Sequence, residues 1–368
     1  MDSSVGTRAG ALVDVVTTEA EAAGLAVPPL LVRAAVEGFL DERGLGSGPL
    51  RETLVGGGHS NVTFLLDRDD WRGVLRRSPR PPYQPKAHDM GREAVVQQAL
   101  ADSDVPVPRI DAVETTGAVL GVPFYVMDWL DGDVVTDAVP PLLASPAGHR
   151  GLGEAFVDTL ALLHAQDYAQ LGLGGLGRPD GMAERQLSVF SRLWESHRTR
   201  DIPAVDAAER WLREHLPPPS GPAALVHGDF RLGNLMWART DQARVRALLD
   251  WELATIGEPL SDLGYLLSTY PERPEERGAL LSLATAVVAP GFPSRADLIG
   301  RYAEATGRDL TGLRWWLVLA FWRTAVGLES FYRRGLAGTT DDPFILELES
   351  GVPELADQAL LAIEGGWA

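Results

Sequence analysis

Five residues between positions 227 and 250 have the types and the spacing that phosphate chemistry requires. His227, Gly228 and Asp229 follow a short apolar run, and Asn234 comes five residues after Asp229, directly before a second apolar run. Asp250 ends a further apolar run, sixteen residues after Asn234. Two carboxylates and one amide oxygen are hard ligands of the kind that Mg²⁺ takes in proteins, usually together with phosphate oxygens of a substrate. We therefore expect these three side chains to meet at strand ends around one ion.

Phosphoryl transfer requires few protein groups. These are a carboxylate that orients the attacking hydroxyl, an asparagine and an aspartate that hold the metal, and a cation that binds the phosphates. Asp229, Asn234 and Asp250 supply the first three. A plain Asp/Asn turn between two strands is the structural alternative. A metal-dependent hydrolase that uses His227 and Asp229 is a weaker alternative, because such sites usually need a second histidine near a carboxylate.

The elements that must position these residues follow from the hydrophobic pattern. Residues 1–44 have apolar residues at helical spacing, with Gly44 as a stop, whereas residues 50–77 contain short β-type runs and a glycine cluster. A helix at 91–102 and strands at 117–130 follow. Beyond residue 150 the pattern is mainly helical around the strand–loop–strand stretch 225–252, and the last helices are expected at 277–288, 294–306, 311–335 and 343–364.

This order of elements predicts an α+β fold with two lobes. We expect an N-terminal helical segment at 1–49, a small β-rich lobe at 50–130, and a larger, mainly helical lobe at 131–368. The small lobe would have one helix beside its strands. The large lobe would carry the polar residues of the 225–252 stretch.

The composition narrows the function classes. The chain of 368 residues has a net charge of −18 and no cysteine, so disulfides, thiolate metal sites and cysteine nucleophiles are excluded. A nucleic-acid binder would need a basic surface, which the sequence does not provide. The apolar stretch 313–330 contains Arg314 and Arg323 and is too short between charges to span a bilayer, so we expect a buried helix there. We expect a cytoplasmic protein with a small-molecule partner; the sequence leaves the oligomeric state open.

At this point the chain resembles a known family. HGDFRLGN (227–234) followed by LLDWE (248–252) is similar to the aminoglycoside phosphotransferase superfamily, which has the protein-kinase-like fold. Further stretches resemble one subgroup, the bacterial homologues of the kinase-like domain attached to certain acyl-CoA dehydrogenases. These stretches are GGGHSNVTFLL (56–66), VLRRSP (74–79), GREAVVQQAL (91–100), GVPFYVMDWLDG (121–132), ERQL (184–187) and DWELATIGEPLSDLGYLL (250–267).

The resemblance implies roles for the residues of the large lobe. Asp229 would orient the acceptor hydroxyl as catalytic base, and Asn234 and Asp250 would be magnesium ligands. His227 would brace the loop. Arg231 would face either phosphate or acceptor.

The resemblance also implies a nucleotide site in the small lobe. Its glycine-rich loop would contribute Gly57, Gly58, Ser60 and Asn61, because glycine lets backbone N–H groups approach phosphate oxygens. A plain hairpin turn is the alternative for that cluster. The candidate residues on the following elements are Arg76, Glu93, Met127 and Trp129.

A kinase-like fold usually places a lysine on its third strand, but the only lysine here, Lys86, lies in a Pro-rich loop. Arg76 would take its place, since a guanidinium can grip two phosphate oxygens. Glu93 on the next helix would be its ion-pair partner. Met127 and Trp129 would flank the hinge where backbone groups pair with adenine.

The resulting expectation is an ATP- and Mg²⁺-dependent phosphotransferase acting on a small-molecule hydroxyl. The subgroup favours a hydroxyacyl-CoA as the acceptor. An aminoglycoside or macrolide antibiotic is the alternative that the fold suggests, and the acidic net charge favours such a cationic acceptor. A protein that binds nucleotide but catalyses no reaction is the alternative from another functional class. Arginine at position 76 in place of the usual lysine would then indicate that catalytic activity was lost.

Overall fold

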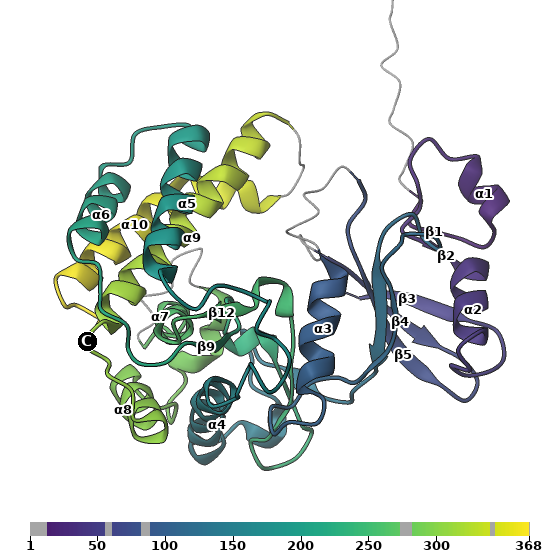
Figure 1. Ribbon diagram of the computed structural model, residues 1–368, viewed down its shortest axis with the longest axis horizontal. Coiled ribbons are helices and arrows are strands. Elements are labelled where there is room, and N and C mark those ends of the chain that lie inside the picture. The colour runs from purple at the N-terminus through teal and green to yellow at the C-terminus, as the bar shows by residue number, and fades with distance from the viewer. Residues whose placement is uncertain (1–12, 56–60, 82–88, 273–281, 339–342, 368) are drawn as a thin grey trace, which may run out of the picture. The chain divides into compact units, whose positions relative to one another are not determined.

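The computed structural model describes residues 13–55, 61–81, 89–272, 282–338 and 343–367 (Figure 1). The chain divides into two compact units. The first consists of Met1–Gln98 and Pro108–Leu130, and the second of Ala99–Val107 and Asp131–Ala368. No helix in the described ranges combines the length and the apolar character that a membrane crossing requires.

The first unit is built on a five-stranded antiparallel sheet. Its strands, in spatial order, are β3 (Arg51–Val55), β4 (Val62–Asp67), β5 (Arg72–Arg77), β7 (Phe124–Asp128) and β6 (Ile110–Glu114). Helix α2 (Arg33–Asp41) covers one face of this sheet and α3 (Met90–Leu100) covers the other (Figure 1).

Alternation along the strands decides which side chains meet which helix. Phe124 and Val126 of β7 join the core on the α2 side, where Phe39 packs edge-on against Phe124 with ring centroids 4.9 Å apart. Tyr125 and Met127 point to the opposite face and pack with α3. On β5 the same period of two buries Leu75 on the α2 side and turns Arg76 toward α3.

The expectation of a helical segment before residue 45 is only partly correct. A two-stranded parallel sheet, β1 (Val15–Val16) with β2 (Leu31–Val32), frames the short helix α1 (Glu19–Ala23). β-branched residues favour the extended chain before α1, and Thr18 then starts the helix with a capping box. Gly44 follows the end of α2 with φ of 66°, as its predicted role as a stop requires.

The second unit is mainly helical. Its helices are α4 (Pro146–His164), α5 (Met182–His197), α6 (Pro203–Glu214), α7 (Leu260–Ser268), α8 (Arg295–Thr306), α9 (Leu313–Leu336) and α10 (Leu348–Ile363). Shorter 3₁₀ turns occupy Pro141–Leu143, Leu232–Asn234, Trp251–Leu253, Ser282–Val288 and Pro343–Glu347. Helix α9 is central, because α5, α6, α7 and α10 all pack against it (Figure 1).

The predicted helices at 294–306 and 311–335 correspond to α8 and α9, and most of α9 up to Val326 is buried as expected. Two other expectations need correction. The stretch 277–288 is a 3₁₀ turn from Ser282 onward, and its earlier part lies outside the described residues. The stretch 343–364 begins with a 3₁₀ turn before α10 starts at Leu348.

Two small sheets lie among these helices. Strands β11 (Val245–Leu248), β10 (Leu235–Trp237) and β8 (Asp133–Val134) form one antiparallel sheet, and β9 (Ala224–Val226) pairs with β12 (Thr255–Gly257) in the other. These strands are short, with two to four residues each. Strands β9 and β10 fix the two ends of the 227–234 loop, which joins them.

The close packing of α7 on α9 depends on Gly264. A Cβ at Gly264 would lie 2.7 Å from the main-chain carbon of Trp316. Gly264→Ala must therefore separate the two helices, and we expect it to lower the free energy of unfolding by about 1–3 kcal/mol. Chemical denaturation monitored by circular dichroism measures this change.

Gly300→Ala in α8 is the matched control, because an ideal Cβ there meets no atom within 4 Å. It should stabilise the protein by about 0.5–1 kcal/mol through the lower backbone entropy of the unfolded chain. Equal effects of the two substitutions would contradict the packing argument.

Candidate active site

The strand pairing brings the ends of two loops together. Leu235 of β10 pairs with Leu248 of β11, and the Leu249 N–H donates to the Asn234 carbonyl oxygen at 2.8 Å. Asn234 therefore directly precedes β10, at the end where β11 finishes, and Asp250 follows two residues after Leu248. The sequence spacing between Asn234 and Asp250 is the length of one hairpin.

Asp229 and Asn234 are in direct contact. Asn234 donates through Nδ2 to the carboxylate Oδ2 of Asp229 and to its main-chain carbonyl, both at 2.8 Å. Arg231 Nε lies 3.4 Å from the same Oδ2. The Asp229 side chain remains 21% exposed, so its carboxylate is oriented by the loop and still open to a ligand.

Asp250 has an unusual backbone conformation. Its φ of 67° makes it the one non-glycine residue of the described chain in the left-handed region. This conformation costs free energy for any residue with a Cβ, although aspartate tolerates it better than most. It turns the chain sharply out of β11 and into the 3₁₀ turn at Trp251.

A buried carboxylate fixes the start of the 227–234 loop. Asp262, in the first turn of α7, accepts the His227 N–H through Oδ2 at 2.6 Å and the Gly228 N–H through Oδ1 at 2.8 Å. His164 Nε2 lies 3.2 Å from Oδ2, and the other His164 nitrogen contacts the Tyr302 hydroxyl at 2.8 Å. Burial raises the pKa of Asp262, but the contacts with His164 and the His227 N–H outweigh it and lower that pKa below its usual value.

His227 braces the loop from inside. Its Nε2 contacts the Leu249 carbonyl at 2.9 Å, and its Nδ1 accepts the Asp229 N–H at 3.3 Å. The ring is fully buried. Because Nδ1 is an acceptor, Nε2 carries the proton and donates to Leu249.

Two residues outside the predicted set, Tyr265 and Arg323, complete this loop. Tyr265 of α7 forms a side-chain hydrogen bond with Asp229, and burial followed by the Asp229 charge raises the pKa of Tyr265 well above its usual value. It therefore stays protonated and donates. Arg323 of α9 lies over the Tyr265 ring, 4.9 Å from the centroid, and donates through Nη2 to the Gly228 carbonyl at 2.9 Å. Arg323 therefore has partners within the protein.

The donor set fits a magnesium ion. Because Asn234 donates through Nδ2 to Asp229, its carbonyl oxygen Oδ1 points away from that carboxylate and can serve as a ligand atom. Asp250 supplies a carboxylate at the neighbouring strand end. No group of three or more His, Cys, Asp or Glu side chains in the described ranges is arranged to hold a metal. Magnesium needs fewer protein ligands, because phosphate and water complete its shell.

The candidate nucleotide residues of the first unit form a second cluster. Arg76 Nε donates to Glu93 Oε2 at 3.0 Å, and the two side chains are only 15% and 1% exposed. Asn61 Nδ2 donates to the other Glu93 oxygen at 2.9 Å, and the Tyr125 hydroxyl donates to Oε2 at 3.0 Å. Burial, followed by the Glu93 charge, raises the pKa of Tyr125 well above its usual value, so it remains a donor.

The remaining candidates lie at the edges of this cluster or outside the described residues. Gly57, Gly58 and Ser60 belong to the undescribed stretch 56–60. Met127 is paired within the sheet, whereas Trp129 follows the end of β7 and is half-exposed, with Arg72 stacked 4.7 Å from its ring centroid.

With this geometry in place, the comparisons with known proteins decide the family. Residues 52–316 match the family described as the phosphotransferase enzyme family. The chain belongs to that family. Its resemblance to aminoglycoside phosphotransferases and its α+β, protein-kinase-like fold, both predicted from sequence, are confirmed. The description of that family names phosphotransferase enzymes and no acceptor.

The names of individual relatives refer to two kinds of chemistry, that of acyl-CoA and that of aminoglycosides. Acyl-CoA dehydrogenase family member 11 of Gallus gallus is 35% identical over 320 residues, which are 85% of this chain and 40% of that protein. The chain thus spans about two fifths of the length of such curated relatives. A crystal structure from Ralstonia eutropha JMP134, described as a candidate aminoglycoside phosphotransferase, is 30% identical with a TM-score of 0.77, and the match covers 90% of this chain and 98% of that one.

A third relative shows the fold alone. It is an aminoglycoside phosphotransferase in a ternary complex with AMP-PNP and hygromycin B, 16% identical, with a TM-score of 0.57 and coverage of 89% of this chain and 98% of that one. Phosphotransferases of this fold therefore include a protein that binds an ATP analogue and an antibiotic together.

The buried His164 predicts a pH dependence of stability. Burial lowers the pKa of His164, and the contact with Asp262 opposes this only in part. On acidification below about pH 6.5, the unfolded chain binds a proton before the folded chain does, so stability falls by up to about 1.4 kcal/mol per pH unit. His164→Gln removes the imidazole that binds this proton. The stability of the variant should therefore fall less than that of wild type between about pH 7 and pH 5.

Urea denaturation at several pH values measures both slopes. Parallel slopes for wild type and His164→Gln would contradict the assignment of a neutral, buried His164. The slope is the readout, because the substitution also changes the absolute stability.

Proposed function

We propose that this chain is an ATP- and Mg²⁺-dependent phosphotransferase that acts on the hydroxyl group of a small molecule. Membership of the phosphotransferase enzyme family supports the reaction type. The observation that carries the proposal is Asp229, whose carboxylate contacts Asn234, Arg231 and Tyr265 and is still partly exposed.

Asp229 would act on the acceptor. A carboxylate held in a fixed orientation can accept the hydrogen of a hydroxyl group and align its oxygen with the γ-phosphate. The three contacts restrict the rotation of Asp229, so less conformational entropy is lost when the acceptor binds. Arg231 beside it would offer a positive charge to a phosphate or to the acceptor.

Asn234 and Asp250 would hold the metal. A bound Mg²⁺ would neutralise charge on the transferring phosphoryl group and fix the orientation of the triphosphate. The strained backbone of Asp250 supports this role, because strain at a polar residue is typical of functional sites.

Arg76 and Glu93 would hold the nucleotide in the first unit. Glu93 receives hydrogen bonds from Arg76, Asn61 and Tyr125, which fixes the direction of the guanidinium. A fixed guanidinium can bind phosphate oxygens in the place of the usual lysine. Gly57, Gly58 and Ser60 would approach the phosphates, and Met127 and Trp129 would flank the adenine.

We propose a hydroxyacyl-CoA as the acceptor class. The similarity to acyl-CoA dehydrogenase family member 11 supports it, because 85% of this chain matches a protein named for acyl-CoA chemistry. An aminoglycoside is the second candidate, supported by the structural likeness to the protein from Ralstonia eutropha. The net charge of −18 favours the cationic candidate in the encounter step, but it adds no recognition of a particular group.

The direct test is phosphate transfer to a panel of acceptors. Purified protein is incubated with ATP or GTP, Mg²⁺, and either 3- or 4-hydroxyacyl-CoA thioesters or aminoglycosides, and ³¹P NMR identifies the product. We expect a phosphate ester of the hydroxyacyl-CoA, and Asp229→Asn should lower kcat by about 10²–10⁴-fold. Binding of AMP-PNP with Mg²⁺ should persist in that variant.

Tyr265→Phe is the graded companion variant, because it removes the hydroxyl and keeps the ring beneath Arg323. Losing one hydrogen bond to a charged group should lower kcat about tenfold and leave nucleotide binding unchanged. Transfer to aminoglycosides alone would refute the acyl acceptor. Nucleotide binding without transfer to any acceptor would favour an inactive binding module instead.

A further inference from the structure

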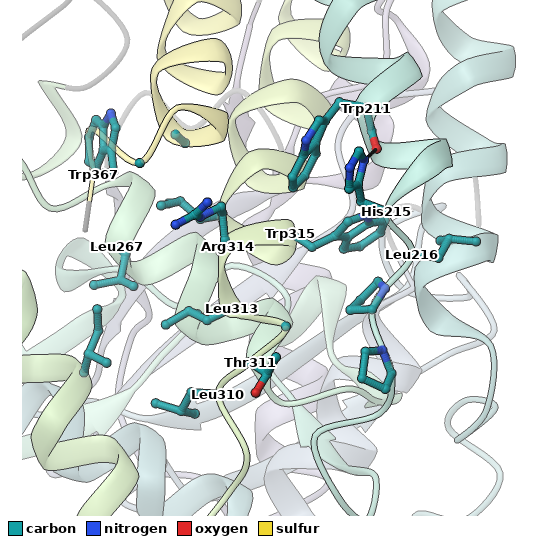
Figure 2. A pocket seen from close by; sticks show the side chains of 17 residues that line it. Trp211, His215, Leu216, Leu267, Leu310, Thr311, Leu313, Arg314, Trp315 and Trp367 are labelled. Carbon is teal, nitrogen blue, oxygen red and sulfur yellow. Dashed lines mark hydrogen bonds between the residues drawn. The ribbon is translucent and has the colours of Figure 1, made fainter.

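The second unit contains a cavity that takes no part in the proposed reaction. Its volume is about 550 Å³, within the range of about 300–1,000 Å³ that is usual for small-molecule sites. The end of α6 with the residues after it, the start of α9, and the end of α10 with the residues after it form most of its wall (Figure 2).

The walls are apolar and rich in indole rings. Trp211, Trp315 and Trp367 all line the cavity, together with leucine and proline side chains (Figure 2). The indole N–H of Trp315 donates to the Leu212 carbonyl at 2.9 Å, and that of Trp367 donates to Gln358 at 3.0 Å. These donors are used within the protein, and the two rings are only 2% and 4% exposed. The apolar surface that is open to an occupant therefore belongs mainly to Trp211, Leu216 and Leu310, which are more exposed.

Within the part of the chain that the structure describes, Arg314 is the one fully charged side chain that lines the cavity. Its side chain is exposed to solvent at the mouth of the cavity, and it makes no hydrogen bond or ion pair with any residue that the structure describes. An ideal Cβ on Gly365 would lie 3.7 Å from Arg314 Nη2, so the guanidinium reaches the segment that follows α10. In Figure 2 it lies in the view between Trp367 and Trp211.

The charge of this wall contrasts with the rest of the chain. The protein has 51 acidic and 33 basic residues, yet no aspartate or glutamate is among the described residues that line the cavity. His215 adds a polar edge; it stacks on Trp211 with ring centroids 4.6 Å apart, and its Nδ1 contacts the Trp211 carbonyl at 2.8 Å. The wall is therefore complementary to an apolar body that carries one negative charge.

The cavity is separate from the loop that holds Asp229. None of the candidate catalytic or metal residues lines it. Arg314 and Arg323 lie nine residues apart on α9, which places them about 13 Å apart along the helix axis. Arg323 of α9 contacts the 227–234 loop through the Gly228 carbonyl, whereas the α9 residues that line the cavity lie between Leu313 and Leu317.

We propose that this cavity is a second small-molecule site, for an amphipathic carboxylate whose apolar body lies against Trp211 and the neighbouring leucine side chains and whose carboxylate pairs with Arg314. The site is independent of the phosphotransfer proposed above, and its occupant is not the phosphate acceptor. A planar guanidinium can bind a carboxylate through two parallel hydrogen bonds.

Isothermal titration calorimetry with decanoate and 1-decanol tests this site, because the two probes share an apolar chain and differ in charge. Wild type should bind decanoate about three- to fivefold more tightly than 1-decanol. Because Arg314 is exposed, Arg314→Gln should weaken decanoate binding by about three- to fivefold and leave 1-decanol unchanged. Failure of wild type to bind decanoate, or equal decanoate affinity in Arg314→Gln, would overturn the proposal.

Two further variants fix the location and the specificity. Arg210→Gln is the matched charge control, since Arg210 is exposed on α6 and does not line the cavity; it should bind decanoate as wild type does. Leu310→Trp, at a half-buried lining position, should fill part of the cavity and weaken both probes. Thermal unfolding of each variant confirms that it is folded.

Asp229→Asn separates this proposal from the proposed function. Decanoate should bind this variant as it binds wild type, whether or not phosphate transfer is detected with any acceptor. Loss of decanoate binding in Asp229→Asn would place the probe at the acceptor site and overturn the second site.

Discussion

The buried carboxylate of Asp262 is the constraint on which the candidate active site depends. Burying a carboxylate is costly unless hydrogen bonds replace its lost hydration. Asp262 receives the backbone N–H groups of His227 and Gly228 and the contact from His164, so its charge is compensated and the chain leaving β9 is fixed. Gly228 is required here: its φ is 85°, and a Cβ would lie 2.6 Å from the Leu253 carbonyl oxygen.

This anchor aligns two helices with one loop. Asp262 and Tyr265 lie on the same helix, one turn apart, so the residue that fixes the start of the loop also positions the hydroxyl that contacts Asp229. Arg323 adds a contact from α9 to the Gly228 carbonyl. The close approach of α7 and α9 at Gly264 makes both contacts possible, so the core of the helical unit and its chemistry share one packing arrangement.

Much of this could be predicted from sequence, because the decisive signals are local. The alternation along β5 and β7 indicates which residues face α3, and the Asp229–Asn234 spacing matches one short loop. Tyr265 could not be assigned, since its contact with Asp229 joins residues 36 positions apart and depends on how α7 is anchored. The parallel pair β1–β2 was missed for a similar reason, because strand pairing leaves little trace in a two-residue run.

The central claim is that Asn234 and Asp250, held at adjoining strand ends beside Asp229, bind the metal of a nucleotide complex. A crystal structure of the protein with AMP-PNP and Mn²⁺ tests it through the anomalous signal of the metal. We predict a metal ion within about 2.0–2.4 Å of Asn234 Oδ1 and of an Asp250 carboxylate oxygen. A metal ion bound only by phosphate and water, or by other side chains, would contradict the account.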